Sequence, residues 1–451
     1  IIMDDTIVSI STSLGVGAIA IIRLSGPKAI EIVNKIFKGK DLTKVDSHTI
    51  NYGYIKENDT IIDEVLVSIM RAPKTYTTED VVEINTHGGI ATTNKVLELC
   101  LTNGARLAEP GEFTKRAFLN GRIDLTQAEA VEDIITSTTD KSLNLSMNQL
   151  TGSLKKLITD TRKTMVNLMA NIEVNIDYPE YEDAENITIP LLKEKLVPIK
   201  NKLSKLLEES KNAKIIKDGI DVALIGRPNV GKSSLLNLFL EEEKAIVTNI
   251  AGTTRDIVEG QTIINGIKIN FIDTAGIRNT TDVVEKIGVE KSKQMISKAD
   301  LNILILNNNE PITNEDKELL ELIKSKPSII FINKNDLETK LDLEQTPNIV
   351  QGNTLSLEGI KDLKQKIIEY FNLEKIEVKD ATYLTNARQN ALIKNTISYI
   401  DQALEDIENE VPVDMIEINI RAAWDTLGEI IGATYKDELL DELFSNFCLG
   451  K

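Results

Sequence analysis

Residues 226–233 carry the pattern Gly-x-x-x-x-Gly-Lys-Ser, which is typical of a loop that binds phosphate groups. An apolar run at 221–225 precedes this loop and a helical pattern at 234–239 follows it. Glycines let the backbone wrap around phosphate oxygens, and the start of the helix adds free N–H groups. In that frame Lys232 would contact the β- and γ-phosphates and Ser233 would bind Mg²⁺. A chance glycine-rich turn is the alternative, and the motifs that follow argue against it.

A second motif, Asp-Thr-Ala-Gly at 273–276, follows the apolar run 267–272. A carboxylate at the end of a strand can hold magnesium through a water molecule, which is the role expected for Asp273. Gly276 leaves a backbone N–H free to meet the γ-phosphate. The second motif therefore predicts the part of the site that senses the terminal phosphate.

A third motif, Asn-Lys-Asn-Asp at 333–336, follows the apolar run 328–332. The Asp336 carboxylate can accept hydrogen bonds from N1–H and the 2-amino group of guanine. Adenine offers neither donor, so ATP would leave a buried acceptor unpaired. Four residues alone are a weak match, but three motifs in this order indicate a GTPase. Ser356-Leu357 is a candidate base-contacting loop, and an ordinary loop before a helix is an equal alternative.

The segment 252–256, Gly-Thr-Thr-Arg-Asp, is typical of a first switch loop, in which Thr254 would complete the magnesium shell; a threonine-rich surface turn is the alternative. Ile277 follows the second motif where Ras-type GTPases carry a glutamine that orients the attacking water. Isoleucine cannot do this, so either the protein is a slow switch or another group positions the water. The candidates are Asp282, Glu285 and Glu290 for the water, and Arg255 and Arg278 for stabilising charge.

Other segments are more specific than a generic GTPase requires. They are Asn229, the run 245–256 and Phe447-Cys-Leu-Gly-Lys451, together with 18–26, 87–89, 110–121 and 124–130. On these residues the chain resembles the family of tRNA-modification GTPases called MnmE or TrmE. The resemblance extends from Asp5 to Lys451 and covers essentially the whole chain.

The resemblance implies that a potassium ion takes the place of an arginine finger. Its ligands would be the Asn229 side chain and the backbone carbonyls of Thr248, Ile250 and Thr253. A cation against the β- and γ-phosphate oxygens would neutralise charge that develops in the transition state. The resemblance gives Glu285 the water-positioning role, for which an ordinary solvated helix acid is the alternative. It also implies that two GTPase domains of a homodimer pair during hydrolysis.

Together the motifs and the resemblance predict one set of GTP-binding residues. They are Asn229, Val230, Gly231, Lys232, Ser233, Ser234, Thr248, Asn249, Ile250, Ala251, Gly252, Thr253, Thr254, Asp273, Thr274, Ala275, Gly276, Asn333, Lys334, Asp336, Ser356 and Leu357.

The resemblance also implies a folate site in the N-terminal domain, with contacts from Arg23, Glu83, Arg122 and Lys451. An acid can accept N–H bonds from a pterin ring, and cations can meet the glutamate tail. The residues by themselves favour surface ion pairs. The implied folate is 5,10-methylenetetrahydrofolate, with 5-formyl-tetrahydrofolate as an analogue.

The family's partner is an FAD-dependent protein, MnmG (GidA), with which it would form a heterotetramer. Together they would add a carboxymethylaminomethyl or aminomethyl group to C5 of the wobble uridine of certain tRNAs. The alternative is a ribosome-assembly or regulatory GTPase that acts by nucleotide-switched binding. Such factors usually carry a basic RNA-binding domain, and they lack the Cys-x-Gly-Lys segment.

Composition limits the function further. The chain has 451 residues, two cysteines and a formal net charge of −18. An acidic chain does not favour tight RNA binding on its own, so tRNA would bind mainly through the complex. Two cysteines predict no disulfide framework. No apolar run reaches the roughly 18–20 residues of a membrane span, and Ile1-Ile2-Met3 does not resemble a signal peptide, so a cytoplasmic protein is expected.

We expect a multidomain α/β and α+β fold. Residues 1–120 mix β-branched strands with helices, 121–214 and 376–451 are helical, and 215–375 form a Ras-like P-loop GTPase domain inserted between the helical parts. The resemblance implies that residues 1–120 are a domain for tetrahydrofolate binding and dimerisation. Thr126-x-x-Glu129 predicts a capping box. Core packing along one long helix is predicted for Leu150, Leu154, Leu157, Met165, Leu168 and Ile172.

Overall fold

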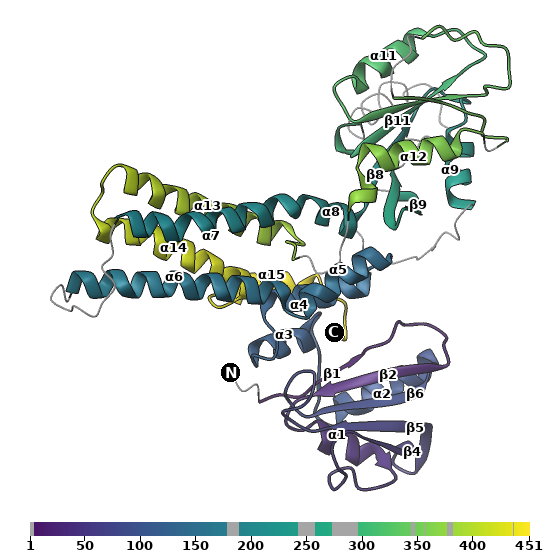
Figure 1. The fold of residues 1–451 in the computed structure, drawn as a ribbon. Coiled ribbons are helices and arrows are strands. Elements are labelled where there is room, and N and C mark those ends of the chain that lie inside the picture. Colours follow the sequence, from purple (N-terminus) through teal and green to yellow (C-terminus); the bar gives the residue numbers. More distant parts are fainter. Residues whose placement is uncertain are drawn as a thin grey trace. The chain divides into compact units, whose positions relative to one another are not determined.

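The structure is a computed structural model that describes residues 4–177, 189–241, 258–272, 296–343, 348–356, 358–376, 382–435 and 437–451. The chain divides into two compact units (Figure 1). One comprises residues 1–136, 146–205 and 387–451, and the other comprises 137–145 and 206–386. The three predicted domains are a finer division, and their boundaries stay a prediction. In the described part of the chain, no helix is both long enough and apolar enough to cross a membrane.

The first unit begins with a seven-stranded sheet whose order is β3-β4-β5-β6-β2-β1-β7. Neighbouring strands are antiparallel, except that β7 runs parallel to β1. The strands are β1 (Ile7–Ile10), β2 (Ile19–Ser25), β3 (Phe37–Lys38), β4 (Thr49–Glu57), β5 (Thr60–Met70), β6 (Val81–His87) and β7 (Arg106–Leu107). The mixture of strands and helices agrees with the α+β region that the sequence predicted for residues 1–120.

Helices α1 (Ala29–Ile36) and α2 (Ile90–Thr102) share one core with this sheet. Ile22 and Leu24 of β2 and Ile84 of β6 belong to that core. Successive side chains of a strand point to opposite faces, so the residues between them lie on the other face. Arg23 and Glu83 are such residues, and they are paired in register across β2 and β6.

The helical part of the first unit is built from segments far apart in the sequence. Helix α14 packs against both α6 and α13. The helices are α3 (Glu112–Leu119), α4 (Leu125–Thr136), α5 (Asp140–Leu150), α6 (Ser153–Asp177), α7 (Ile189–Glu209), α13 (Ala387–Glu408), α14 (Val413–Ile431) and α15 (Asp437–Ser445), of which α5 and α7 run into the second unit. Leu154, Met165, Leu168 and Ile172 of α6 are buried, which confirms four members of the predicted core stripe. Leu150 instead ends α5, and both Leu150 and Leu157 are only half-buried.

The predicted capping box at Thr126 and Glu129 is wrong, because α4 already begins at Leu125. The reciprocal bonds lie two residues earlier: Gln127 N–H donates to Asp124 Oδ1 at 2.8 Å, and Asp124 N–H donates to Gln127 Oε1 at 3.1 Å. Glu129 instead accepts hydrogen bonds from Arg388 and Gln389 at the start of α13.

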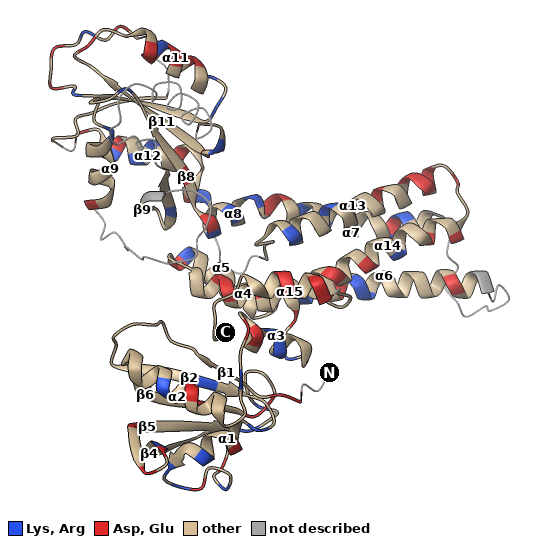
Figure 2. Ribbon diagram, turned by 180° about the vertical axis from the view of Figure 1, so that it is seen from behind, with Lys and Arg blue, Asp and Glu red and all other residues tan. Residues whose placement is uncertain are grey.

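Acidic and basic residues occur along the same helices of this unit (Figure 2). Two ion pairs join α7 to α13: Lys193–Glu408 at 3.1 Å and Lys200–Asp401 at 2.6 Å. Exposed pairs of this kind contribute little stability, about 0–1 kcal/mol each. The helices are therefore held together mainly by their apolar faces.

The second unit contains a six-stranded sheet with order β13-β12-β11-β8-β10-β9, in which only β9 is antiparallel to its neighbour. Its strands are β8 (Ile220–Ile225), β9 (Val258–Ile264), β10 (Ile267–Ile272), β11 (Leu301–Asn307), β12 (Ser328–Asn333) and β13 (Ile349–Gln351). The helices among its described residues include α8 (Lys211–Asp218), α9 (Lys232–Glu241), α11 (Asn314–Ile323) and α12 (Ile360–Tyr370). This is the α/β GTPase fold that the motifs predicted.

Candidate functional site

The described phosphate and base motifs meet at one edge of the second sheet. Strands β8, β12 and β13 run parallel, so their carboxyl ends lie on the same side. The phosphate loop follows β8, Asn333 ends β12, and Ser356 lies in the loop after β13. Ligands of open α/β sheets bind at such carboxyl ends. The sheet therefore brings together motifs that are more than 100 residues apart.

Lys232 begins α9, and its side chain folds back over the phosphate loop. Its Nζ donates to the backbone carbonyl of Gly226 at 2.5 Å and to that of Arg227 at 2.8 Å. An ammonium group has three N–H donors, so a third remains for a phosphate oxygen. Burial lowers the pKa of Lys232, and Glu315 opposes that shift. A phosphate oxygen would favour the charged form.

The loop backbone depends on conformations that most residues avoid. Gly231 has φ +109°, and a Cβ there would collide with the side-chain amide of Asn333. Asn229 has φ 65°, in the left-handed region where asparagine is tolerated better than most residues. Asn229, Ser233 and Ser234 are exposed, whereas Val230 is buried. The loop thus offers polar side chains to solvent and anchors itself through Val230.

Asn333 holds the phosphate loop from the base-binding side. Its Nδ2 donates to the carbonyl of Val230 at 2.8 Å, and its Oδ1 accepts from the backbone N–H groups of Lys334 and Thr354 at 2.9 and 3.1 Å. Lys334 has φ 64°, and its Nζ donates to the carbonyl of Asn229 at 3.4 Å. The third motif therefore fixes the first one directly.

Asp336 lies just beyond this brace and is exposed, as is Ser356. Both lie at the sheet edge where a base would bind. The other predicted GTP, magnesium, potassium and catalytic residues lie outside the described residues. They are Thr248, Asn249, Ile250, Ala251, Gly252, Thr253, Thr254, Asp273, Thr274, Ala275, Gly276, Glu285 and Leu357.

A second polar cluster lies on the sheet of the first unit. Arg23 Nε and Glu83 Oε1 are 2.8 Å apart, and both side chains are largely buried. Arg23 Nη1 also donates to the carbonyl of Gly450 at 3.3 Å, and Ser11 Oγ donates to the same oxygen at 3.1 Å. These bonds hold Gly450 against Ser11 and against Arg23 of strand β2, more than 400 residues away in the sequence.

Lys451 completes this cluster. Burial lowers the pKa of Lys451, the positive charge of Arg23 lowers it further, and Glu83 opposes the shift. Three of the four residues predicted for folate therefore share one electrostatic environment: two cations and one carboxylate. Cys448 Sγ lies 3.9 Å from Glu132 Oε1. Partial burial of the thiol, and then the charge of Glu132, raise its pKa.

Tyr76 connects the fourth residue, Arg122, to the cluster. The guanidinium of Arg122 lies 4.8 Å from the ring centroid of Tyr76, and that of Arg23 lies 5.9 Å from it. The Tyr76 hydroxyl is 2.9 Å from Thr114 Oγ1 on α3. Both guanidinium distances fit cation–π attraction. No local pattern in the sequence marks Tyr76, because its partners lie 38 or more residues away.

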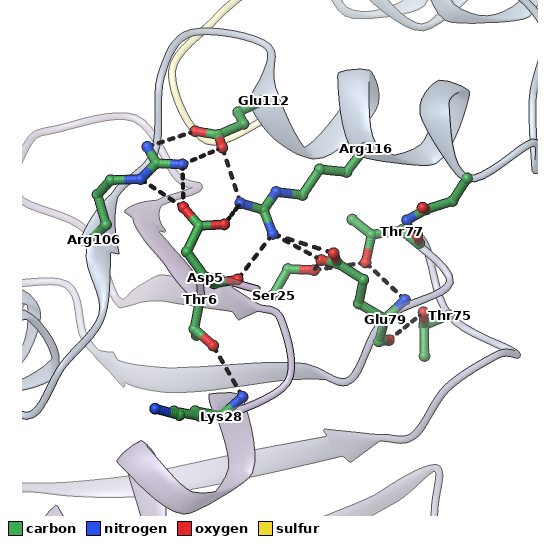
Figure 3. Close-up of polar contacts among 11 residues, drawn as sticks. Asp5, Thr6, Ser25, Lys28, Thr75, Thr77, Glu79, Arg106, Glu112 and Arg116 are labelled. Carbon is green, nitrogen blue, oxygen red and sulfur yellow. Dashed lines mark hydrogen bonds and ion pairs between the residues drawn. The ribbon is translucent and has the colours of Figure 1, made fainter. Parts of the chain in front are cut away.

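The same unit contains an ionic network around Arg116 (Figure 3), whose side chain is fully buried. Its guanidinium contacts Asp5 at 2.7 Å, Glu112 at 3.1 Å and Glu79 at 3.2 Å. Burial raises the pKa of Glu112, but Arg106 and Arg116 outweigh it and the net shift is downward. The network joins the segment before β1, helix α3 and the segment before β6.

Known proteins match this chain over nearly its whole length. A family model described as the MnmE helical domain matches residues 125–448, and one described as the GTP-binding protein TrmE N-terminus matches residues 6–122. A tRNA modification GTPase MnmE from Bacillus cytotoxicus is 52% identical and covers 99% of both chains. The MnmE of Streptococcus thermophilus is 54% identical, covering 99% of this chain and 98% of its own.

Among solved structures, a single-residue variant of Era from Aquifex aeolicus, bound to GDP·AlF4⁻, is 30% identical. It covers 40% of this chain and 66% of its own, with a TM-score of 0.26. The full-length identity to the two relatives and the two family models carry the assignment by themselves. The chain belongs to the MnmE family of tRNA modification GTPases.

Proposed function

We propose that this tRNA modification GTPase depends on potassium and works with an FAD-dependent partner, MnmG (GidA). The pair would add a carboxymethylaminomethyl or aminomethyl group to C5 of the wobble uridine of certain tRNAs. The observation that carries the proposal is that one chain has a braced GTP site and, separately, the cluster of Arg23, Glu83 and Lys451. A GTPase that acts only as a switch has no need of the second cluster.

The GTP site supplies mainly electrostatic stabilisation. The Ser233 and Thr254 hydroxyls would hold Mg²⁺, which neutralises charge on the β- and γ-phosphates. The Asn229 side chain, with the carbonyls of Thr248, Ile250 and Thr253, would hold K⁺ against the same oxygens. Asn229 is exposed on the loop that also carries Lys232, which suits this role.

Glu285 would position the attacking water, because Ile277 offers no polar group. Hydrolysis would drive a rearrangement of the complex and would not itself transfer the one-carbon unit. Two copies of the chain would pair through their GTPase domains during hydrolysis, in the cytoplasm where tRNA is found.

The second cluster has the polarity that a reduced folate requires. Glu83 would accept N–H bonds from the pterin ring, and the cations Arg23, Arg122 and Lys451 would meet the glutamate tail. Tyr76 would add an aromatic surface beside Arg122. When bound, 5,10-methylenetetrahydrofolate would supply the one-carbon unit, and FAD on the partner would supply redox chemistry.

The potassium role is tested by GTP turnover in potassium and in sodium buffers. We expect the intact protein to be faster in potassium by about tenfold or more and Asn229→Ala to lose that difference. Asn237→Ala, on the exposed side of α9, is the matched control. Equal turnover of the intact protein in both salts would remove potassium from the mechanism.

The water-positioning role is tested with Glu285→Ala against Glu290→Ala. Loss of turnover with retained GTP affinity is expected for Glu285→Ala alone. Near-normal turnover in that variant would reassign the role to another acid.

The tRNA reaction is tested by nucleoside analysis of bulk tRNA from a deletion strain that carries either the intact gene or Arg23→Ala. The deletion should lack the modified wobble uridine, and only the intact gene should restore it. Unchanged wobble nucleosides in the deletion, with altered ribosome profiles, would instead favour a ribosome-assembly GTPase. Binding of 5-formyl-tetrahydrofolate to the purified protein tests the folate site separately.

A further inference from the structure

Arg227, the second residue of the phosphate loop, points its side chain away from the loop toward the turn between β11 and α11. Its Nε is 3.0 Å from both carboxylate oxygens of Asp316, and its Nη2 is 2.7 Å from Glu310 Oε2. The side chain of Arg227 is 18% exposed and that of Asp316 only 3%. These are charge-assisted hydrogen bonds in a partly desolvated place, which are stronger than exposed pairs.

Both carboxylates are themselves held in place. Asp316 forms a capping box with Thr313: its Oδ2 accepts from the backbone N–H of Thr313 at 3.0 Å, and its own N–H donates to Thr313 Oγ1 at 3.2 Å. Glu310 Oε1 accepts from Asn307 Nδ2, at the end of β11, at 2.6 Å. The partners of Arg227 are therefore fixed to a central strand and to a helix start.

The backbone of the same residue holds the phosphate-binding lysine. The carbonyl of Arg227 accepts from Lys232 Nζ at 2.8 Å, and the preceding carbonyl of Gly226 accepts from it at 2.5 Å. Rotation of the peptide at 227 would turn that carbonyl away and leave the ammonium group with one fixed partner. The orientation of Lys232 thus depends on the carbonyl of Arg227, and the ion pairs of the Arg227 side chain hold that residue in place.

We propose that Arg227 is a positioning residue for GTP hydrolysis: its ion pairs with Asp316 and Glu310 fix the loop so that Lys232 aims its free N–H at the nucleotide phosphates. Asn333 braces the loop at Val230, toward the base. Arg227 braces it at the opposite end, toward α11. The loop is then held at both ends before nucleotide arrives, and binding needs little rearrangement.

The test compares kcat and KM for GTP in Arg227→Ala, Arg227→Lys and Glu310→Ala with the intact protein. Arg227→Ala should lower kcat/KM about tenfold, because a mispositioned phosphate ligand costs binding and rate together. Arg227→Lys should restore part of the loss, since an ammonium can pair with one carboxylate but cannot match both. Glu310→Ala should give a smaller loss, and its combination with Arg227→Ala should be less than additive.

Lys324→Ala is the matched control, because it breaks an exposed pair with Glu321 in the same sheet domain. It should leave kcat/KM unchanged. A purely structural role for Arg227 would lower the melting temperature and leave the kinetics of the folded protein intact. Arg227→Ala with kcat/KM within about twofold of the intact protein would overturn the proposal. If Arg227→Ala does not fold, the other two variants decide. An unchanged kcat/KM in both Arg227→Lys and Glu310→Ala would overturn the proposal. A fall in kcat/KM of about threefold or more in either variant would support it.

Discussion

The side-chain amide of Asn333 donates a hydrogen bond to the backbone carbonyl of Val230 at 2.8 Å, so the base-reading motif holds the phosphate loop in shape. Removing that amide also leaves the N–H groups of Lys334 and Thr354 without their acceptor. Each buried group left unpaired costs about 1–3 kcal/mol.

We therefore expect Asn333→Ala to weaken GTP binding roughly tenfold to a hundredfold, as calorimetry would measure. Asn335→Ala, two residues along, is the control, because its side-chain oxygen has no hydrogen-bond partner among the described residues. Unaltered affinity in Asn333→Ala would show that the loop keeps its shape without the brace.

Asp336 is expected to select guanine through its two acceptor oxygens. Asp336→Asn replaces one acceptor with a donor, so GTP affinity should fall by at least about tenfold. The base of XTP carries an oxygen where guanine has an amino group. XTP should therefore bind more tightly to this variant than to the intact protein. Competition between the two nucleotides measures both effects. Glu338→Gln removes an exposed acid nearby and should change neither affinity.

Folate binding should depend on pH through Lys451. Burial, and then Arg23, lower the pKa of Lys451, and an anionic ligand needs its charged form. Affinity for 5-formyl-tetrahydrofolate should therefore fall as pH rises through that lowered pKa, earlier than an ordinary lysine would allow. The pH dependence of stability has the opposite sign to that of folate binding. The unfolded chain holds the Lys451 proton more tightly than the folded chain does. The contribution of Lys451 to the free energy of unfolding therefore rises with pH.

Lys451→Arg keeps the charge at alkaline pH and should flatten that part of the binding curve. Lys451→Gln should weaken binding about tenfold at neutral pH and remove the dependence. A curve with the same alkaline fall in Lys451→Gln would assign the titration to another group.

The network around Arg116 should be needed for the stability of the N-terminal sheet. Arg116→Met would leave Glu79 without its buried cation and Glu112 with Arg106 alone, at a cost of about 3–5 kcal/mol. Hydrogen exchange of β1 and α3 should rise accordingly, and the melting temperature should drop. Arg106→Met is the control, because its side chain is 45% exposed and its loss should cost less. Equal protection in the two variants would contradict this role.

The sequence predicted correctly those motifs whose structure depends only on the strand and turn beside them. The phosphate loop and the Asn-Lys-x-Asp motif each need a particular strand and turn, and the structure has both where they were predicted. The capping box was wrong for a physical reason: Asp124-x-x-Gln127 and Thr126-x-x-Glu129 both fit the pattern. The first pair forms the capping box, because the Glu129 carboxylate accepts hydrogen bonds from Arg388 and Gln389 instead.

Contacts between distant segments could not be predicted in this way. Arg227 and Asp316 are 89 residues apart, and an arginine inside a phosphate loop gives no local indication of its partner. Tyr76 is similar, since an aromatic residue in a loop can pack in many ways. The family resemblance brought Arg23 and Glu83 to notice, and the register of β2 against β6 explains why they touch.

The discontinuous helical part has a consequence for synthesis of the chain. Arg162 of α6 stacks on Trp424 of α14, with the guanidinium 4.1 Å from the ring, yet 262 residues separate the two. At about 5–20 residues per second, a ribosome needs on the order of 10–50 s to make the intervening chain. During that interval the apolar side of α6 has no α14 to cover it. The nascent protein therefore passes through an aggregation-prone period, which ends only when α14 leaves the ribosome.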